Sequence, residues 1–158
     1  MTKTVYRVLW WALTLAWCGC IVYLSLQDAP QSAALSSGLT KRILEWFSSY
    51  RALSVSQQAV VLLKVQDLVR ELAHVAEYTV LGALTTLLAR SYRVRSWLVV
   101  WGATAAFAVM DECLQEFATV GRAFQVIDLI KDWLGAFLGI GCVWLVCLIA
   151  KRAKHKKE

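Results

Sequence analysis

Residues 70–82 read RELAHVAEYTVLG, and they place an arginine, a histidine and two glutamates at the start of an apolar run. A second polar group, DECLQ at 111–115, lies inside another apolar run. Charged groups within a lipid-spanning helix are costly, so they commonly mark a functional site. These two stretches therefore predict both a membrane fold and a polar site within it.

The whole chain has the composition of an integral membrane protein. It contains 158 residues, of which 59% are hydrophobic, and its mean hydropathy is +0.55. A soluble domain of this length would carry more polar surface. The net charge of +6 comes from clustered cations that flank apolar runs. Such clusters are ordinary signals of membrane topology, and we expect no nucleic-acid partner.

Four apolar segments are long enough to cross a bilayer as helices, since about 20 residues span the hydrocarbon core. These segments cover about residues 5–26, 73–89, 96–117 and 127–150. Cations gather before the first segment, at 90–95 and in a basic tail at 151–158. Because positive flanks stay in the cytoplasm, the tail and both termini are expected there. We predict a single all-α membrane domain, residues 1–158, with four transmembrane helices in a bundle.

The segment 31–72 is predicted to face outward as an amphipathic helical loop. Its apolar side chains recur at helical spacing, at Leu35, Leu39, Ile43, Trp46, Phe47 and Tyr50. This pattern suits a helix that lies in the membrane interface, and a loop packed over the bundle would show similar periodicity. Ser54 and Gln57 then predict a capping box that opens a second helix, which would run directly into the second span.

Helical periodicity gathers the polar residues of the last three spans onto narrow faces, because residues four and seven apart share one side of a helix. In chain order these residues are Arg70, His74, Glu77, Tyr78, Asp111, Glu112, Gln115, Asp128 and Asp132. Gly135 and Gly139 follow on the fourth span, at the small-residue spacing that lets helix backbones approach closely. The acids that precede these glycines should therefore face a neighbouring helix.

The predicted topology puts the three polar faces at one depth, in the outer half of the membrane. Arg122 lies in the short loop 118–126, which is predicted to face outward, and would lie next to the same region. We therefore expect one shared ligand-binding cluster in which Arg70, His74 and Arg122 are the partners of the carboxylates. Each face taken alone also allows a plain structural role, such as acids that complement a helix N-terminus.

Four polar motifs occur in a fixed order along the chain. They are SLQ at 25–27, RELAHVAEYTVLG at 70–82, DECLQEF at 111–117 and GRAFQVIDLIKDWLG at 121–135. As an ordered set they resemble the VanZ-like family of bacterial membrane proteins, with one departure at Asp132, where the family pattern more often has asparagine. The resemblance implies a multi-pass protein of the bacterial cytoplasmic membrane with a role in the cell envelope. The founding member is associated with low-level resistance to the glycopeptide teicoplanin.

Three functions fit such a cluster. The leading hypothesis is a polar pocket at the outer leaflet that binds an amphipathic ligand, such as a lipid headgroup, a lipid-linked wall precursor or teicoplanin. The alternative is a membrane-embedded enzyme acting on a lipid or phosphate substrate, by metal-assisted chemistry or with an acid–base residue. The candidates for that residue are His74, Glu77, Asp111 and Glu112. The third is a proton-linked transporter, for which four spans are few unless the protein forms an oligomer.

No cofactor is predicted from the sequence. The five cysteines have no paired spacing of the kind that binds zinc, so we expect no resident metal, and a divalent cation enters only with the enzyme hypothesis. The expected partners are membrane lipids and, under the leading hypothesis, a lipid-linked precursor or a glycopeptide.

Overall fold

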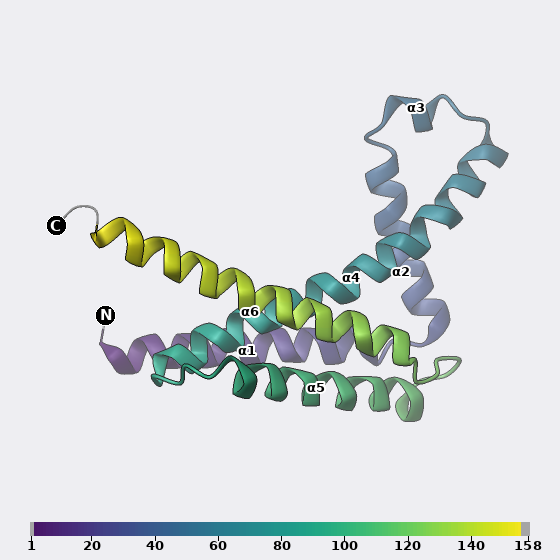
Figure 1. Cartoon of the computed structure of the whole chain (residues 1–158). Coiled ribbons are helices and arrows are strands. Elements are labelled where there is room, and N and C mark those ends of the chain that lie inside the picture. Colours follow the sequence, from purple (N-terminus) through teal and green to yellow (C-terminus); the bar gives the residue numbers. More distant parts are fainter. Residues whose placement is uncertain (1, 156–158) are drawn as a thin grey trace.

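Four long helices form the body of the protein in the computed structural model, which describes residues 2–155 (Figure 1). The helices are α1 (Lys3–Ser25), α2 (Ala29–Leu44), α3 (Ser48–Arg51), α4 (Val55–Ser91), α5 (Trp97–Ala118) and α6 (Val126–His155). Helices α1, α4, α5 and α6 are each long and apolar enough to cross a membrane. The predicted all-α bundle of four spans is confirmed. Lys156 and Lys157 of the basic tail lie outside the described residues.

The second span belongs to a much longer helix than its apolar run. Helix α4 has 37 residues, so at 1.5 Å per residue it is about 55 Å long. It begins with the predicted capping box, in which the Gln57 N–H donates to the Ser54 hydroxyl and the Ser54 N–H donates to the Gln57 side chain. From there α4 continues without a break into the bundle.

In the segment 31–72, which is predicted to face outward, helix α2 folds back against the N-terminal part of α4 (Figure 1). Helix α2 ends at Leu44, whereas the apolar stripe suggested a helix as far as Tyr50. The Trp46 N–H donates to the Ile43 carbonyl, three residues earlier rather than four, so the chain leaves the helix in a tighter turn. The Trp46 side chain is 83% exposed. Gln66 of α4 holds α2 by donating to the Ser36 hydroxyl at 3.1 Å.

Helices α4 and α6 cross at glycines. A Cβ atom added to Gly135 or Gly139 would overlap a backbone carbonyl of α4, at Val75 or Thr79 respectively. Gly82 of α4 meets the α6 backbone in the same way. The predicted close helix contact at Gly135 and Gly139 is therefore confirmed, and α4 is the neighbouring helix.

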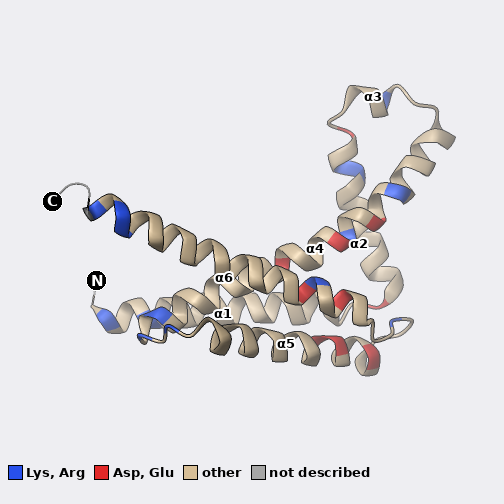
Figure 2. Ribbon diagram, viewed as in Figure 1, with Lys and Arg blue, Asp and Glu red and all other residues tan. Residues whose placement is uncertain are grey.

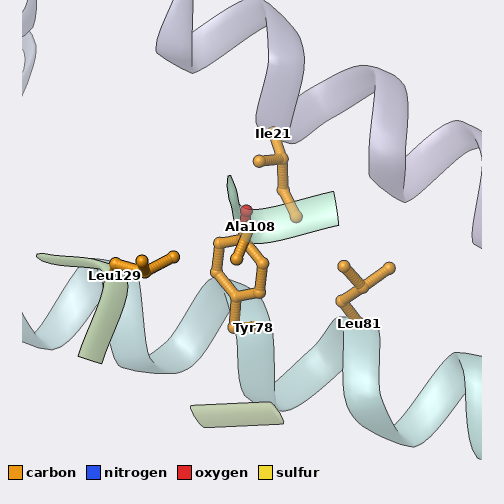
Figure 3. Packing of buried hydrophobic residues seen from close by; sticks show 5 residues of the cluster. All are labelled: Ile21, Tyr78, Leu81, Ala108 and Leu129. Atoms are coloured by element: carbon orange, nitrogen blue, oxygen red, sulfur yellow. The ribbon is translucent and has the colours of Figure 1, made fainter. Parts of the chain in front are cut away.

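A small apolar core joins the four long helices (Figure 3). Its buried members are Ile21, Tyr78, Leu81, Ala108 and Leu129. Each long helix contributes at least one of them, so the core packs all four helices together. Tyr78, which was counted among the polar residues of the second span, is only 1% exposed and packs within this core.

The two ends of the bundle differ in charge (Figure 2). Arg7 of α1 donates to the Ser91 carbonyl at 3.2 Å and lies over the Tyr92 ring, so the start of α1 meets the loop between α4 and α5. The C-terminal end of α6 lies at the same end of the bundle (Figure 1). Acidic residues of α5 and α6 gather toward the opposite end, which we call the outer end (Figure 2). The membrane side that each end faces stays a prediction.

Candidate functional site

Helices α4, α5 and α6 bring most of the predicted polar residues together at the outer end. Five of these side chains are almost fully buried, namely Asp111 (1% exposed), Glu112 (0%), Gln115 (3%), Asp128 (4%) and Asp132 (0%). His74 of α4 is partly buried beside them. We call His74, Asp111, Glu112, Asp128 and Asp132 the polar cluster. Carboxylates from two helices thus surround a histidine from a third.

His74 lies between two aspartates of α6. Its Nδ1 atom is 3.1 Å from Asp132 Oδ1, and its Nε2 atom is 4.0 Å from Asp128 Oδ2. Asp128 and Asp132 are one helical turn apart, so both face α4 just before the glycine crossing. A carboxylate beside each ring nitrogen fixes the orientation of the imidazole.

The cation that pairs with Asp128 is a lysine rather than an arginine. Lys131 Nζ lies 2.9 Å from Asp128 Oδ1 and 3.6 Å from a carboxylate oxygen of Glu71. Arg70 and Arg122 form no ion pair within residues 2–155, so the expectation that they pair with the carboxylates is wrong. Sequence analysis missed Lys131, although its i, i+3 spacing from Asp128 is a known pattern for helical ion pairs.

Three buried carboxylates of the polar cluster share one bonding pattern. In each, one oxygen accepts a hydrogen bond and the other is buried without a partner among the described residues. The bound oxygens lie next to Gln115 Nε2 (3.4 Å), the Gln125 backbone amide (3.0 Å) and His74 Nδ1 (3.1 Å). The unpartnered oxygens are Asp111 Oδ1, Glu112 Oε1 and Asp132 Oδ2. Buried acceptors are nearly always satisfied in folded proteins, so three together require a physical explanation.

A cavity of about 360 Å³, which we call the outer cavity, opens beside His74. Its apolar wall includes Leu24, Leu35, Leu39, Val69 and Ala73. Its polar wall includes Arg70, His74, Glu77, Gln115 and Arg122. Helix α2 forms part of the wall, so the outward segment belongs to the site.

Arg122 reaches into the site from the loop between α5 and α6. It is half-buried, and its Nη1 atom donates to the Ser25 carbonyl at 3.4 Å. Burial lowers the pKa of the Arg122 guanidinium, the positive charge of Arg70 lowers it further, and Glu112 raises it. Because a guanidinium stays protonated in proteins, the cavity wall contains a half-buried cation without a carboxylate partner in the described chain.

The loop that carries Arg122 is hydrogen-bonded to the turn between α1 and α2. The Val120 N–H donates to Asp28 Oδ1 at 2.7 Å, and the Ala29 N–H donates to the Val120 carbonyl at 3.2 Å. Gly121 follows with a φ of +77°, a conformation that favours glycine. These contacts hold Arg122 in place over the cavity. No pattern in the sequence indicated that Asp28 would take part.

The model of one protein family, VanZ/LLP1, matches residues 10–148. The chain belongs to the VanZ/LLP1 family. The match includes helix α2 and the first part of α4, which lie outside the motifs that carried the resemblance. No curated protein and no solved structure matches the chain significantly.

The site of this VanZ/LLP1 protein combines two chemical environments. Arg70 and Arg122 line the outer cavity, where they can bind an anionic group. The buried carboxylates lie behind them, and His74 belongs to both regions. The arrangement can therefore hold an anion, transfer a proton through the imidazole, or hold a cation among the carboxylates.

Proposed function

We propose that this VanZ/LLP1 protein binds an amphipathic molecule with an anionic headgroup in the outer cavity. The observation that supports this most strongly is the division of the cavity wall. Leu35 and Leu39 line one part, and Arg70 and Arg122 line another. Arginine forms charge-assisted hydrogen bonds with phosphate and carboxylate groups, while leucine side chains suit a hydrocarbon chain.

The position of the cavity along α4 also supports a headgroup ligand. The hydrocarbon core of a bilayer is about 30 Å thick. If the hydrocarbon core begins at Ser91, the last residue of α4, about 30 Å of helix at 1.5 Å per residue reaches back to about Glu71. Arg70 and His74 are therefore expected near the level at which lipid headgroups meet the hydrocarbon core.

Three kinds of molecule share this chemistry: anionic lipids, lipid-linked wall precursors, and acylated glycopeptides such as teicoplanin. Each combines a polar head with a hydrocarbon chain. Two arginines favour the ligand with the most concentrated negative charge, so we expect a lipid-linked phosphate compound to bind most tightly. Glycopeptide tolerance is the phenotype that we propose for such binding.

Replacing Arg122 with glutamine is expected to reduce binding of anionic lipid by about 10- to 150-fold. The loss of one charged hydrogen-bonding group costs about 1.5–3 kcal/mol. The loop should keep its conformation, because it is also held by the hydrogen bonds between Val120 and residues Asp28 and Ala29. The measurement is mass spectrometry of lipids that copurify with the protein, followed by titration with phosphatidylglycerol dissolved in detergent micelles.

Arg42→Gln is the matched control, because Arg42 is an exposed cation of α2 that does not line the outer cavity. This variant should retain lipid as the wild type does. If Arg122→Gln binds phosphatidylglycerol as tightly as Arg42→Gln does, the proposed anionic-headgroup site is wrong.

A second function, acid–base chemistry on a bound lipid, is supported by the pairing of His74 with Asp132 at 3.1 Å. His74 also lines the outer cavity, so the headgroup of a bound lipid would lie near an oriented imidazole. Incubation with candidate lipids and mass analysis distinguishes the two functions. A His74-dependent change in lipid mass favours an enzyme, and lipid recovered unchanged favours a binding protein.

We further propose that both termini face the cytoplasm, with the protein in the bacterial cytoplasmic membrane. The positively charged segments at one end of the bundle support this orientation. A reporter fused after Lys157 should behave as cytoplasmic, and one inserted near Ser49 should behave as external. An external C-terminus would invert the molecule and move the outer cavity to the inner leaflet.

A further inference from the structure

We infer that the polar cluster binds one divalent transition-metal ion through His74, Glu112 and Asp132. These residues belong to α4, α5 and α6 respectively. One potential ligand atom from each lies within 4.8 Å of the others. Three helices thus converge on a point where nitrogen and carboxylate oxygen ligands meet.

The spacing of these groups is close to that around a bound ion. Bonds from a metal ion such as zinc to imidazole nitrogen or carboxylate oxygen are about 2.0–2.2 Å long, so two ligands of one ion lie no more than about 4.4 Å apart. His74 Nδ1 and Asp132 Oδ1 are already 3.1 Å apart. Small side-chain rotations bring Glu112 into the same coordination sphere.

The unpartnered oxygens of the cluster point independently to a ligand. Glu112 and Asp132 are each 0% exposed, and each has one buried oxygen without a hydrogen-bonding partner within residues 2–155. The other oxygen of Glu112 accepts from the Gln125 amide at 3.0 Å, which orients the carboxylate in the way that outer contacts orient metal ligands. A metal ion would supply a partner for Glu112 and Asp132, and it would replace the present contact between His74 Nδ1 and Asp132 Oδ1.

The charge of the cluster agrees with a bound cation. Lys131 is engaged with Asp128 at 2.9 Å. Of the other three cluster carboxylates, only that of Asp132 has a cationic neighbour within 4 Å in the described chain, and this neighbour is His74. A divalent ion offsets the remaining negative charge and leaves the imidazole neutral, as ligation requires. Nε2 of His74 then carries the proton and faces Asp128 Oδ2 at 4.0 Å, so this carboxylate is placed as the outer partner of a metal-bound histidine.

The combination of one nitrogen ligand with two carboxylate ligands favours one class of metal ion. One imidazole and two carboxylates suit Zn²⁺ or Mn²⁺, whereas Mg²⁺ and Ca²⁺ prefer oxygen ligands alone. Three protein ligands leave coordination positions open, which is typical of metal ions that contact a substrate. His74 also lines the outer cavity. The inference rests on the cluster alone and does not require that the cavity bind a lipid.

Metal analysis of the full-length protein in detergent tests this inference. The protein is prepared without a polyhistidine tag, treated with a chelator, and titrated with Zn²⁺ or Mn²⁺ in the absence of added lipid. We expect about one ion per chain and an increase in Tm when the ion is added, because binding to the folded state stabilises it. Mg²⁺ at the same concentration should give a much smaller increase. If neither Zn²⁺ nor Mn²⁺ binds, the inference is wrong.

Variants locate the ion within the protein. Glu112→Gln and Asp132→Asn keep the side-chain shape and are each expected to weaken metal binding at least tenfold. Glu116→Gln is the matched control, because Glu116 lies one turn further along α5 and also accepts a backbone N–H, from Phe124, but is exposed. It should bind the ion as the wild type does.

The variant results separate this inference from the proposed lipid function. Wild-type metal affinity in both Glu112→Gln and Asp132→Asn would place the ion elsewhere, for example on cysteines, and would overturn the site. Arg122→Gln should weaken lipid binding and keep the metal ion. A wild-type protein that binds anionic lipid but neither Zn²⁺ nor Mn²⁺ would overturn this inference alone, and one that binds the metal ion but no anionic lipid would overturn the proposed function alone.

Discussion

Replacing Gly139 with valine is expected to prevent α6 from packing against α4 and to remove most of the folded protein. A Cβ atom at this position would overlap the Thr79 carbonyl and press on the Ala83 amide. These are backbone atoms that cannot rotate away, so the two helices would have to separate. Overpacking a tight contact costs about 1–3 kcal/mol and occasionally more, and we expect the upper end of this range or beyond at a helix crossing that depends on small residues.

Gly141→Val provides the matched control for this prediction. Gly141 lies two residues further along α6, is exposed, and has no atom within 4 Å of an added Cβ. It should change stability by no more than about 0.5 kcal/mol. The measurements are the yield of monodisperse protein in gel filtration and Tm in detergent. Equal yields and Tm values for the two variants would contradict the close approach of α4 and α6.

Replacing Tyr78 with alanine is expected to give the second large loss of stability. The ring is 1% exposed, and its centroid lies 6.4 Å from that of Phe107. Removing a buried aromatic ring leaves a cavity and typically costs about 3–5 kcal/mol. In a membrane this cost comes mainly from lost packing, because lipid tails are as apolar as the core. The measurement is Tm in detergent together with unfolding in increasing SDS.

Tyr78→Phe separates the ring from its hydroxyl. The Tyr78 hydroxyl has no hydrogen-bonding partner among the described residues, so its loss should change stability by less than about 1 kcal/mol. This variant should therefore melt close to the wild type. If it is as unstable as Tyr78→Ala, the stability attributed to ring packing belongs instead to the hydroxyl.

The helices and their polar faces could be predicted from the sequence because both have local signatures. A span needs about 20 apolar residues, and a helical face repeats every 3.6 residues. Ser54 with Gln57, and Gly135 with Gly139, are likewise short patterns with a direct structural meaning. The structure contains the capping box and the glycine contact at these positions.

Partners across helices could not be predicted in the same way. They depend on the rotation and height of each helix relative to its neighbours, which no local pattern specifies. Arginines were expected beside the carboxylates, yet Lys131 pairs with Asp128 from one turn away. The three residues proposed to bind a metal lie on three helices, so no local spacing in the sequence related them to one another.

The role of the outward segment also depended on the fold. Its apolar periodicity suited a helix lying in the membrane interface, which was expected to screen the entrance of the pocket, but the pattern did not specify which of its residues would face the site. In the structure α2 packs beside α4, and Leu35 and Leu39 face the same cavity as Arg70. The expected periodicity was informative about the helix, but the turn near Trp46 and the position of α2 come from tertiary contacts.

Helix α4 is one continuous helix from Val55 to Ser91. Its C-terminal part belongs to the bundle, and its N-terminal part packs against α2. Its close contact with α6 extends from Val75 to Gly82, and Val55 lies about 30 Å beyond Val75 along the axis. A tilt of roughly 5° at this contact would move that far end by about 3 Å. A force that separates α2 from α4 would therefore also act on the glycine contact between α4 and α6.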